Sequence, residues 1–420
     1  MTKLNELIQQ LCPDGVEYKT LGSFATISRG GNFQKKDFRD DGFPCIHYGQ
    51  IYTKYGLFVD KTVSFISPAC ASKQKTASKN DIIMAVTSEN IEDVCKCIVW
   101  LGDGEVAVSG HSAIIRHSQN PKYLAYYFHS RMFFDQKRKL AHGTKVIEVT
   151  PDKLASVKIP LPPIEVQREI VRILDNFTEL TAELTAELSA RKKQYEYYRD
   201  KLLTFDVFGG GTNRLEWKTL GESIISLSTG LNPRQFFKLN TEDAKNYYVT
   251  IREIQNGTIV FSEKTDRIND EALSLCNNRS HLEVGDVLFS GTGTIGETAI
   301  VSEVPTNWNI KEGVYAIKPK RELLNSRYLM YLLRTRYMQL AISKKVAGGT
   351  VKSIPMGDMR KLQIPVPDIT VQESIVSILD RFDALCNDLT SGLPAEIAAR
   401  QKQYEFYRDK LLTFKERISI

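Results

Sequence analysis

Residues 191–205 read RKKQYEYYRDKLLTF and residues 400–414 read RQKQYEFYRDKLLTF, so one fifteen-residue phrase occurs twice with two differences. Each copy ends a long segment in which apolar residues recur every three or four positions. Such spacing places the apolar residues on one face of a helix, where they can pack on a partner helix. The chain is therefore interpreted as a duplicated module that contains two similar helices.

The duplication extends well beyond this phrase. Residues 16–22 (VEYKTLG) match residues 215–221 (LEWKTLG), and residues 159–164 (IPLPPI) match residues 364–369 (IPVPDI). Between these anchors the two halves diverge, and each contains short apolar runs typical of strands together with short helical segments. The sequence predicts an α+β fold in which a strand-rich variable domain, a Pro-rich hinge and a long helix occur twice.

The predicted domain boundaries follow from these anchors. In order, they are an N-terminal helix with the first variable domain (1–163), a first long helix (164–205), a Gly-rich linker (206–214), a second variable domain (215–367), a second long helix (368–414) and a tail (415–420). Ser391, Gly392 and Pro394 predict an interruption of the second helix near 391–394, because proline is tolerated only at the start of a helical segment.

Both long segments have the alternating four- and three-residue steps of a coiled coil. We predict that the two helices pair antiparallel through these positions, which produces a pseudo-two-fold arrangement with one variable domain near either end. The predicted coiled-coil residues are Val166, Ile170, Ile173, Phe177, Leu180, Leu184, Tyr195, Tyr198 and Leu202 in the first helix, and Val371, Ile375, Ile378, Phe382, Leu385, Leu389, Tyr404, Tyr407 and Leu411 in the second.

Residues 181–188 consist of two identical TAEL tetrapeptides. One more such unit in a continuous helix adds about 6 Å and turns the far end by about 40° beyond a full revolution. Because one base pair of B-DNA turns by a similar angle, the repeat is interpreted as a device that adjusts a spacing in base-pair steps.

Composition restricts the class of protein. A length of 420 residues, with 42% hydrophobic and 25% charged residues, is typical of two or three globular domains. No apolar run approaches the roughly 20 residues that span a bilayer, and the polar start lacks signal-peptide features, so a cytoplasmic protein is expected. The seven cysteines form no CxxC pair and are expected in a reducing compartment. The net charge of +6 permits an acidic partner but does not require one.

With these features the chain resembles a known family. The phrases QYEYYRDKLLTF (194–205) and QYEFYRDKLLTF (403–414), the two variable domains followed by helices, and the TAEL tandem are similar to the specificity subunits of type I restriction-modification systems. The resemblance covers essentially the whole chain. It implies a non-catalytic DNA-reading subunit of a methyltransferase and endonuclease complex, in which each variable domain is a target recognition domain for half of a bipartite site.

The resemblance also implies partners and cofactors. The expected partners are double-stranded DNA, two methylation subunits that dock on the helical spacer and, through the complex, restriction subunits; no membrane is expected. No cofactor is expected on this chain, whereas S-adenosylmethionine, ATP and Mg are expected on partner subunits. Because the two domains differ, the site is expected to be asymmetric. A non-specific gap of roughly 5 to 8 base pairs is expected between its two halves, since the two domains must meet successive major grooves.

Candidate DNA contacts come from polar and basic residues on loops that the duplication aligns. Arg, Lys, Asn and Gln side chains reach base edges in the major groove, although they are equally common on solvated surface. The basic run near residue 75 favours phosphate attraction. The candidates are Arg29, Asn32, Gln34, Lys35, Lys36, Lys73, Lys75, Thr144, Lys145, Asn232, Arg234, Gln235, Lys238, Thr350 and Lys352.

No catalytic or metal-binding residue is predicted. Residues 291–296 (GTGTIG) satisfy the GxGxxG pattern, but Glu297 occupies the position where a P-loop needs lysine. Ser109 and His111 are neighbours without a G-x-S-x-G motif, and no histidine has zinc-site spacing. Two other classes remain open: an interaction scaffold that does not bind nucleic acid, and a nucleotide-using enzyme that depends on the loop 291–298.

Overall fold

The structure is a computed structural model that describes residues 2–205, 215–349, 351–388 and 390–417. The chain divides into two compact units, of which the first comprises Met1–Glu183 with Ile397–Ile420 and the second comprises Leu184–Glu396. Each unit therefore combines one variable domain with parts of both long helical segments. Four parts of the sequence prediction lie outside the described residues: the linker 206–214, the tail residues 418–420, Thr350 and Leu389.

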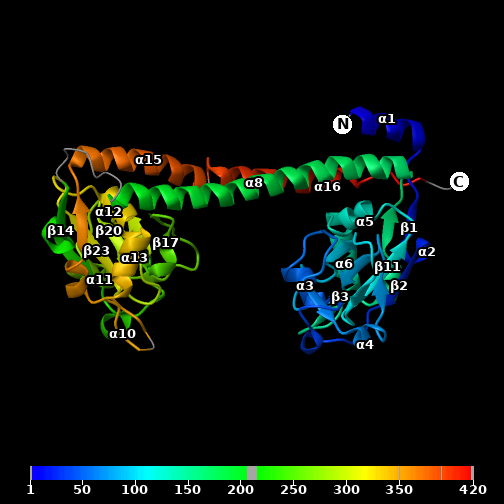
Figure 1. The fold of residues 1–420 in the computed structure, drawn as a ribbon, viewed down its shortest axis with the longest axis horizontal. Helices are drawn as coiled ribbons and strands as arrows, with labels where there is room; N and C mark the ends of the chain where they lie inside the picture. The colour runs from blue at the N-terminus through cyan, green and yellow to red at the C-terminus, as the bar shows by residue number, and fades with distance from the viewer. Residues whose placement is uncertain (1, 206–214, 350, 389, 418–420) are drawn as a thin grey trace. The chain divides into compact units, whose positions relative to one another are not determined.

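The first unit contains two main β-sheets (Figure 1). Its strands are β1 (Tyr18–Thr20), β2 (Ala25–Arg29), β3 (Phe43–Ile46), β4 (Phe58–Val59), β5 (Ser64–Ile66), β6 (Thr76–Ala77), β7 (Ile82–Ala85), β8 (Thr87–Ser88), β9 (Cys97–Trp100), β10 (Val106–Val108), β11 (Ser112–His117), β12 (Ile147–Glu148) and β13 (Lys158–Pro160). The sheet orders are β2-β11-β7-β9-β4 and β5-β3-β10-β6, with the two-stranded pairs β1-β13 and β12-β8.

Helices surround these sheets. They are α1 (Thr2–Leu11), α2 (Leu21–Phe24), η1 (Lys35–Asp37), α3 (Tyr48–Thr53), α4 (Pro68–Ala71), α5 (Pro121–Phe128), α6 (Arg131–Leu140) and α7 (Pro151–Ala155). The long helix α8 (Ile164–Thr204) begins in this unit, and α16 (Leu393–Leu411) ends in it. The main apolar core lies between α5, α6, the beginning of α8 and the central strands β7, β9 and β11.

The second unit repeats this plan with other side chains. Its strands are β14 (Glu216–Thr219), β15 (Ile224–Thr229), β16 (Asn246–Val249), β17 (Ile254–Gln255), β18 (Thr258–Ile259), β19 (Arg267–Ile268), β20 (Val287–Ser290), β21 (Thr298–Ile300), β22 (Trp308–Ile310), β23 (Val314–Pro319) and β24 (Gln363–Val366). Its helices are α9 (Leu220–Ser223), α10 (Pro233–Phe236), η2 (Ile251–Glu253), α11 (Asp270–Arg279), α12 (Ser326–Leu333), α13 (Arg336–Ser343), α14 (Met356–Arg360) and α15 (Ile369–Asn387). The sheet orders are β15-β23-β20-β21 and β19-β16-β22, with the pairs β14-β24 and β17-β18.

The duplication extends to strand register. In the first unit, Arg29 at the end of β2 is opposite Ala113 of β11. In the second unit, Thr229 at the end of β15 is opposite Tyr315 of β23. In both sheets the third strand, β7 or β20, pairs antiparallel with the other side of the central strand. Arg29 and Thr229 therefore occupy equivalent positions.

Local sequence signals determine where the equivalent domain helices α5 and α12 begin. The Asn120 side chain accepts hydrogen bonds from the amides of Lys122 and Tyr123 at the start of α5. Asn325 caps α12 in the same way. An asparagine N-cap satisfies amides that have no partner within the helix. The apolar residues that follow each cap are buried in the core of their own unit.

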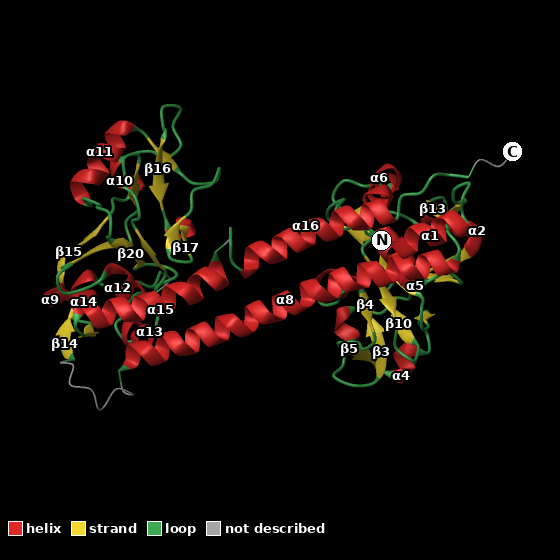
Figure 2. Cartoon of the chain, turned by 90° about the horizontal axis from the view of Figure 1, so that it is seen from above, coloured by secondary structure: helices red, strands yellow, loops and turns green. Residues whose placement is uncertain are grey.

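Within the first unit, α8 and α16 lie side by side and antiparallel (Figures 1 and 2). Val166 and Ile170, near the start of α8, belong to the same buried cluster as Leu411 at the end of α16. Further along α8, the ring of Phe177 stacks on Tyr407 with 5.4 Å between centroids. Full burial of an aliphatic side chain contributes about 1.5–3 kcal/mol before entropy costs, so this packing holds the two helices together.

Within the second unit, the end of α8 packs on α15. The ring of Phe382 stacks on Tyr195 and Tyr198 with centroid distances of 6.4 and 5.7 Å. Burial raises the pKa of the Cys386 thiol and the nearby Lys192 ammonium lowers it, so Cys386 faces an earlier turn of α8 than Phe382 does. The two helices are therefore antiparallel. The predicted α+β fold, the duplication and the antiparallel pairing of the long helices are confirmed within each unit.

The buried face of α15 differs from the predicted heptad stripe. Ile378 and Leu385, which the spacing placed in the interface, are 44% and 38% exposed, and Tyr198 of α8 is 38% exposed. Val376, Leu379 and Cys386, which lie outside the predicted stripe, are buried instead, whereas the predicted Ile375 is buried as expected. The physical reason is that α15 packs against its own domain as well as against α8, which turns its buried face away from the strict heptad positions.

A break separates α15 from α16, because α15 ends at Asn387 and α16 begins at Leu393. The carboxylate of Asp388 accepts hydrogen bonds from the amides of Thr390 and Ser391 in the intervening turn. A Cβ on Gly392 would lie 2.5 Å from the carbonyl oxygen of Ala384, so this turn requires glycine. The break is at the place where Ser391, Gly392 and Pro394 predict an interruption.

Candidate nucleic-acid interface

Three loops of the first unit meet at one end of its two main sheets. The Gly30 amide donates to the Ser112 carbonyl at 3.0 Å, and the Gly31 amide donates to the Val108 carbonyl at 2.7 Å. The Val108 amide in turn donates to the Lys75 carbonyl at 3.0 Å. These bonds bring together the loop after β2, the segment before β6 and the turn between β10 and β11.

The two glycines make this close approach possible. A Cβ on Gly30 would overlap the carbonyl oxygen of Ser109, and a Cβ on Gly31 would overlap the side chain of Gln74. At Gly30 the neighbour is backbone, so this position requires glycine, whereas at Gly31 the neighbour is the end of a flexible side chain. The loop after β2 is therefore held tightly against its neighbours, which limits the motion of the side chains on it.

Arg29, immediately before these glycines, is held by two hydrogen bonds. Its Nε donates to the Gly110 carbonyl at 2.8 Å, and its Nη2 donates to the Glu148 carboxylate at 2.6 Å. The Arg29 side chain remains 45% exposed. A Cβ on Gly110 would be 3.6 Å from Oδ1 of Asn32, so Asn32 lies beside the same turn. The structure thus brings together two of the predicted DNA contacts, Arg29 and Asn32.

Aromatic rings line the neighbouring part of this loop end. The ring of Tyr48 lies 4.6 Å from His47 and 4.9 Å from His111, centroid to centroid. The Tyr48 amide donates to the Ser109 hydroxyl, so Ser109 has a structural contact here. Burial lowers the pKa of His47, and the positive charge of Lys35 acts in the same direction. Lys35 therefore contributes positive potential to this region.

The other predicted contacts of the first unit are exposed side chains around these loops. This holds for Gln34, Lys35, Lys36, Lys73, Lys75, Thr144 and Lys145. The loop with Thr144 and Lys145 closes on the β-bridge between His142 and Glu148, next to Arg29. Lys79, four positions after Lys75, instead precedes the start of β7. It pairs with Asp103 at 2.6 Å, at the opposite end of the sheet.

The equivalent loops of the second unit also meet. Leu231 forms a parallel bridge with Lys311, which matches the bridge between Gly31 and Ser109 in the first unit. Thr292 bridges Ser353, and a pocket of about 470 Å³ opens between these loops. The loops that the duplication aligned around residues 232 and 352 therefore lie together.

The predicted contacts in these loops differ in their environments. The Asn232 side chain caps α10 by accepting from the Arg234 amide at 3.0 Å, so it has a structural contact. Arg234, Gln235, Lys238 and Lys352 are exposed. In Figure 1, α10 lies on the side of the second unit away from α15 and the end of α8. The helix α10, which carries Arg234 and Gln235, thus lies on a side of this unit that the long helices leave uncovered.

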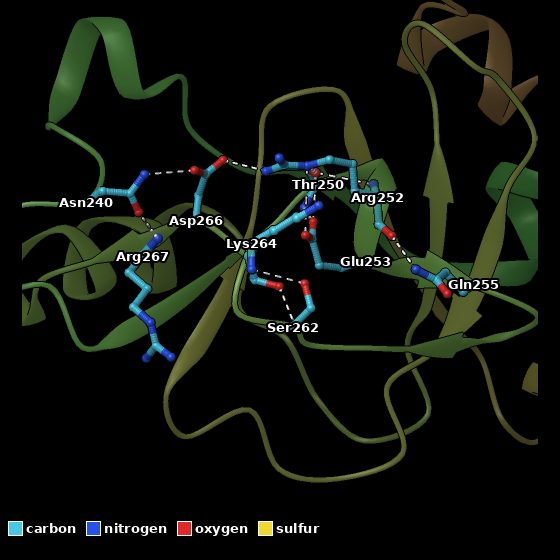
Figure 3. A network of polar contacts seen from close by, with 10 residues as sticks. Asn240, Thr250, Arg252, Glu253, Gln255, Ser262, Lys264, Asp266 and Arg267 are labelled. Carbon is cyan, nitrogen blue, oxygen red and sulfur yellow. Dashed lines mark hydrogen bonds and ion pairs between the residues drawn. The ribbon is translucent and has the colours of Figure 1, made fainter. Parts of the chain in front are cut away.

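A polar network that sequence reasoning missed lies beside the same loops (Figure 3). Arg252 donates to Asp266 at 2.6 Å, and Asn240 donates to the other oxygen of Asp266 at 2.9 Å. The Thr250 amide donates to the buried Glu253 carboxylate at 2.8 Å, which closes the capping box of η2, and the Thr250 hydroxyl donates to the same oxygen at 2.7 Å. Thr250, Arg252 and Asp266 line a pocket of about 420 Å³. The T-x-x-E spacing of Thr250 and Glu253 is the pattern of a capping box, but the bonds from Arg252 and Asn240 to Asp266 join separate segments and depend on the fold.

The catalytic and nucleotide patterns of the sequence have structural explanations. Residues 291–296 form the turn between the antiparallel strands β20 and β21. A phosphate-binding GxGxxG loop leads into a helix whose N-terminus holds the phosphate, so this turn lacks the required context. Within the described residues, no group of three His, Cys, Asp or Glu side chains is arranged to hold a metal ion. Across the same residues, none of the helices combines the length and apolar character needed to cross a bilayer.

Sequence reasoning thus found the loops but not all of the residues that shape them. The duplication identified the loop after β2 and its counterpart before α10, because their flanking strands align. It missed Glu148, Tyr48 and His111, which reach the same place from distant segments. The signal that could have indicated Glu148 is its position just after the predicted contacts Thr144 and Lys145.

Comparison with known proteins agrees with this organisation. Residues 13–191 and 207–399 match the family described as type I restriction modification DNA specificity domain. A type I restriction enzyme specificity subunit of Escherichia coli is 38% identical over 267 residues, which are 61% of this chain and 63% of that protein. A Haemophilus influenzae protein described as a putative type I restriction enzyme specificity subunit is 32% identical over 325 residues, covering 74% of this chain and 77% of that protein.

A solved structure has a similar fold. It comes from work on the complex assembly and conformational transition of the type I R-M system, and it is 20% identical with a TM-score of 0.65. The match covers 96% of this chain and 98% of that chain. At this level of identity the likeness concerns the fold alone.

Proposed function

Because the chain belongs to the type I restriction-modification DNA specificity family, we propose that it reads an asymmetric bipartite DNA site, one half with each unit. The single observation that supports this most directly is the pair of equivalent loop ends with unlike side chains. Arg29 and Thr229 have the same register, yet one is an exposed cation and the other a nearly buried hydroxyl. Two unlike readers select two unlike half-sites.

The loop end of each unit is the proposed DNA-contacting surface. In the first unit it carries Lys35, Lys36, Lys73 and Lys75, which attract phosphates, beside the more confined Arg29. In the second unit it carries the exposed residues that follow β15 and those of the loop around residue 352. Phosphate contacts set the position of each unit on the duplex, whereas contacts to base edges select the sequence.

The repeated phrase supplies a second proposed surface. Tyr197 and Phe406 hold equivalent positions in the two copies, and they are 60% and 62% exposed. Lys201 and Lys410 each lie 5.8 Å from the centroid of the corresponding ring. An exposed aromatic residue repeated in both units is suited to bind the same protein twice. We place one methylation subunit on each, which gives two in the complex.

The chemistry of the complex is then carried out by other subunits. We propose that S-adenosylmethionine binds the methylation subunits, that ATP and Mg bind the restriction subunits, and that the complex works in the cytoplasm. This chain supplies sequence recognition and docking, which require the loops and the helices described above.

The test is to express the chain with its methylation subunit and to map methylated DNA across a genome by single-molecule sequencing. We expect one asymmetric motif with two defined halves separated by a non-specific gap of roughly 5 to 8 base pairs. A palindromic motif would contradict the assignment of two unlike readers.

Binding measurements address the alternative of an interaction scaffold. The affinity of the assembled complex for duplex DNA is expected to fall steeply as salt rises from 50 to 200 mM, because bound phosphates release counterions. A complex that assembles but has no salt-dependent affinity for DNA would favour the scaffold.

A further inference from the structure

We propose that Arg29 reads a guanine in the half-site of the first unit, and that Glu148 and Gly110 position its guanidinium for this contact. The inference rests on the proposed function, in which this loop end faces DNA bases.

The hydrogen bonds of Arg29 leave the right donors available. A guanidinium has five N–H donors, and within the described structure the Nε bond to Gly110 and the Nη2 bond to Glu148 use two of them. The remaining three are on the two terminal nitrogens of a side chain that is 45% exposed. Guanine presents two acceptors, O6 and N7, on its major-groove edge, and two parallel N–H donors of arginine match them.

The ion pair with Glu148 is better explained by positioning than by stability. Both partners are partly exposed, at 45% and 28%, and such pairs contribute about 0–1 kcal/mol to folding. Holding a long side chain in one orientation before binding, however, reduces the entropy that binding must overcome. The backbone next to Arg29 is held as well, because Gly30 lies against the Ser109 carbonyl and the amides of Gly30 and Gly31 donate to the Ser112 and Val108 carbonyls.

The second unit has no such reader at the equivalent position. Thr229 is 9% exposed, and its hydroxyl donates to the Val314 carbonyl and accepts from the Gly313 amide, both at 3.0 Å. Through these two bonds the Thr229 hydroxyl both donates and accepts inside its own domain. The guanine contact is therefore confined to the first unit, so the substitution of one residue should alter one base in one half-site.

The test replaces Arg29 by threonine, the residue at the equivalent position of the second unit, in the full chain assembled with its methylation subunits. Methylated sequences are then mapped for the wild type and for R29T. We expect one guanine of the wild-type motif to lose its selection in R29T, with discrimination reduced about 10- to 100-fold. The other half-site and the gap should be unchanged, and they report that the variant is folded and assembled.

Two further variants separate positioning from charge. Glu148→Gln keeps Arg29 but replaces the charged acceptor of its Nη2 hydrogen bond with a neutral amide. Selection at the same base should therefore relax by a smaller factor than in R29T. Lys79→Thr removes an exposed cation at the opposite end of β7 and should leave the motif as in the wild type.

The outcomes are distinguishable. An unchanged motif in R29T, or an equal loss of methylation at every site with no change in base preference, overturns the proposal and assigns Arg29 a structural role. If the wild-type complex itself produces no bipartite motif, the proposed function fails before any variant is compared.

Discussion

His129 shows how the interior of the first unit treats a titratable side chain. Its ring Nδ1 makes a hydrogen bond of 2.9 Å with the Ala125 carbonyl, in the last turn of α5. Nearby, the buried Lys137 ammonium donates to the carbonyls of Glu92 and Val94 at 2.9 and 2.6 Å. A buried cation satisfied by backbone carbonyls stabilises the segment before β9, but it disfavours a second positive charge close by.

This arrangement predicts a pH-dependent stability. Burial lowers the pKa of His129 to about 4, and the charges of Arg408, Lys137 and Lys96 act in the same direction. As the pH falls below the ordinary histidine pKa of about 6.5, His129 takes up a proton in the unfolded chain but not in the folded chain. The free energy of unfolding should therefore fall by about 2 kcal/mol between pH 7 and pH 5 because of this group. Urea denaturation at the two pH values measures the loss.

The matched variant is His129→Gln, in which this part of the pH dependence should disappear. His281→Gln, which changes an exposed histidine of the second unit, should retain it. An unchanged pH dependence in His129→Gln would show that His129 is protonated equally in both states.

At the scale of elements, each long helix is tied to its domain by a polar contact that occurs twice. Gln167 of α8 accepts from the Asn120 amide at 3.1 Å, and Gln372 of α15 accepts from the Asn325 amide at 2.9 Å. Both glutamines are almost fully buried, so each bond contributes to order as well as to stability. In the repeated phrases of α8 and α16, Tyr197 and Phe406 are exposed to solvent.

The proposed docking role of these two rings is testable by stoichiometry. Tyr197→Ser should reduce the complex from two methylation subunits to one, because a central aromatic anchor typically contributes 2 kcal/mol or more to binding. Phe406→Ser should have the same effect, and the double variant should bind none. Native mass spectrometry of the purified complex counts the subunits. Val304→Ser, which removes an exposed apolar residue without a repeated counterpart, is the control and should bind two.

At the scale of the whole molecule, the boundary between the two units falls inside the TAEL tandem. The first unit includes Glu183 and the second begins at Leu184, while α8 continues as one helix from Ile164 to Thr204. A change in the number of TAEL units therefore alters the helix between the units without touching either set of loops. This is why the tandem is suited to act on the gap and not on the bases that are read.

A third TAEL after residue 188 should widen the gap by about one base pair, because it adds about 6 Å and about 40° of helix. Both half-site sequences should stay the same. Methylation mapping with the variant measures the gap directly. A gap that stays constant, with both halves still recognised, would falsify the idea that the tandem determines the spacing.

Much of the fold was predictable because its signals are local. The repeated phrase, the heptad steps and the helix break at Gly392 and Pro394 are properties of neighbouring residues, and the structure has helices and a turn at these places. The exposure of Ile378 and Leu385 was not predictable, because it depends on how α15 meets both α8 and its own domain. Periodicity identifies a helix face but not the number of partners that cover it.

Repeats and apolar spacing in the chain establish that it is duplicated, that its long helices pair, and which loops of the two halves correspond. They do not establish which side chains meet on those loops, which depends on the folded arrangement of the strands. Arg29 and Glu148 are 119 positions apart in the chain, and their hydrogen bond exists because β2, β11, β7 and the β8-β12 pair bring their ends together. Local spacing carries no information about contacts of this length, since they depend on strand pairing across the whole sheet.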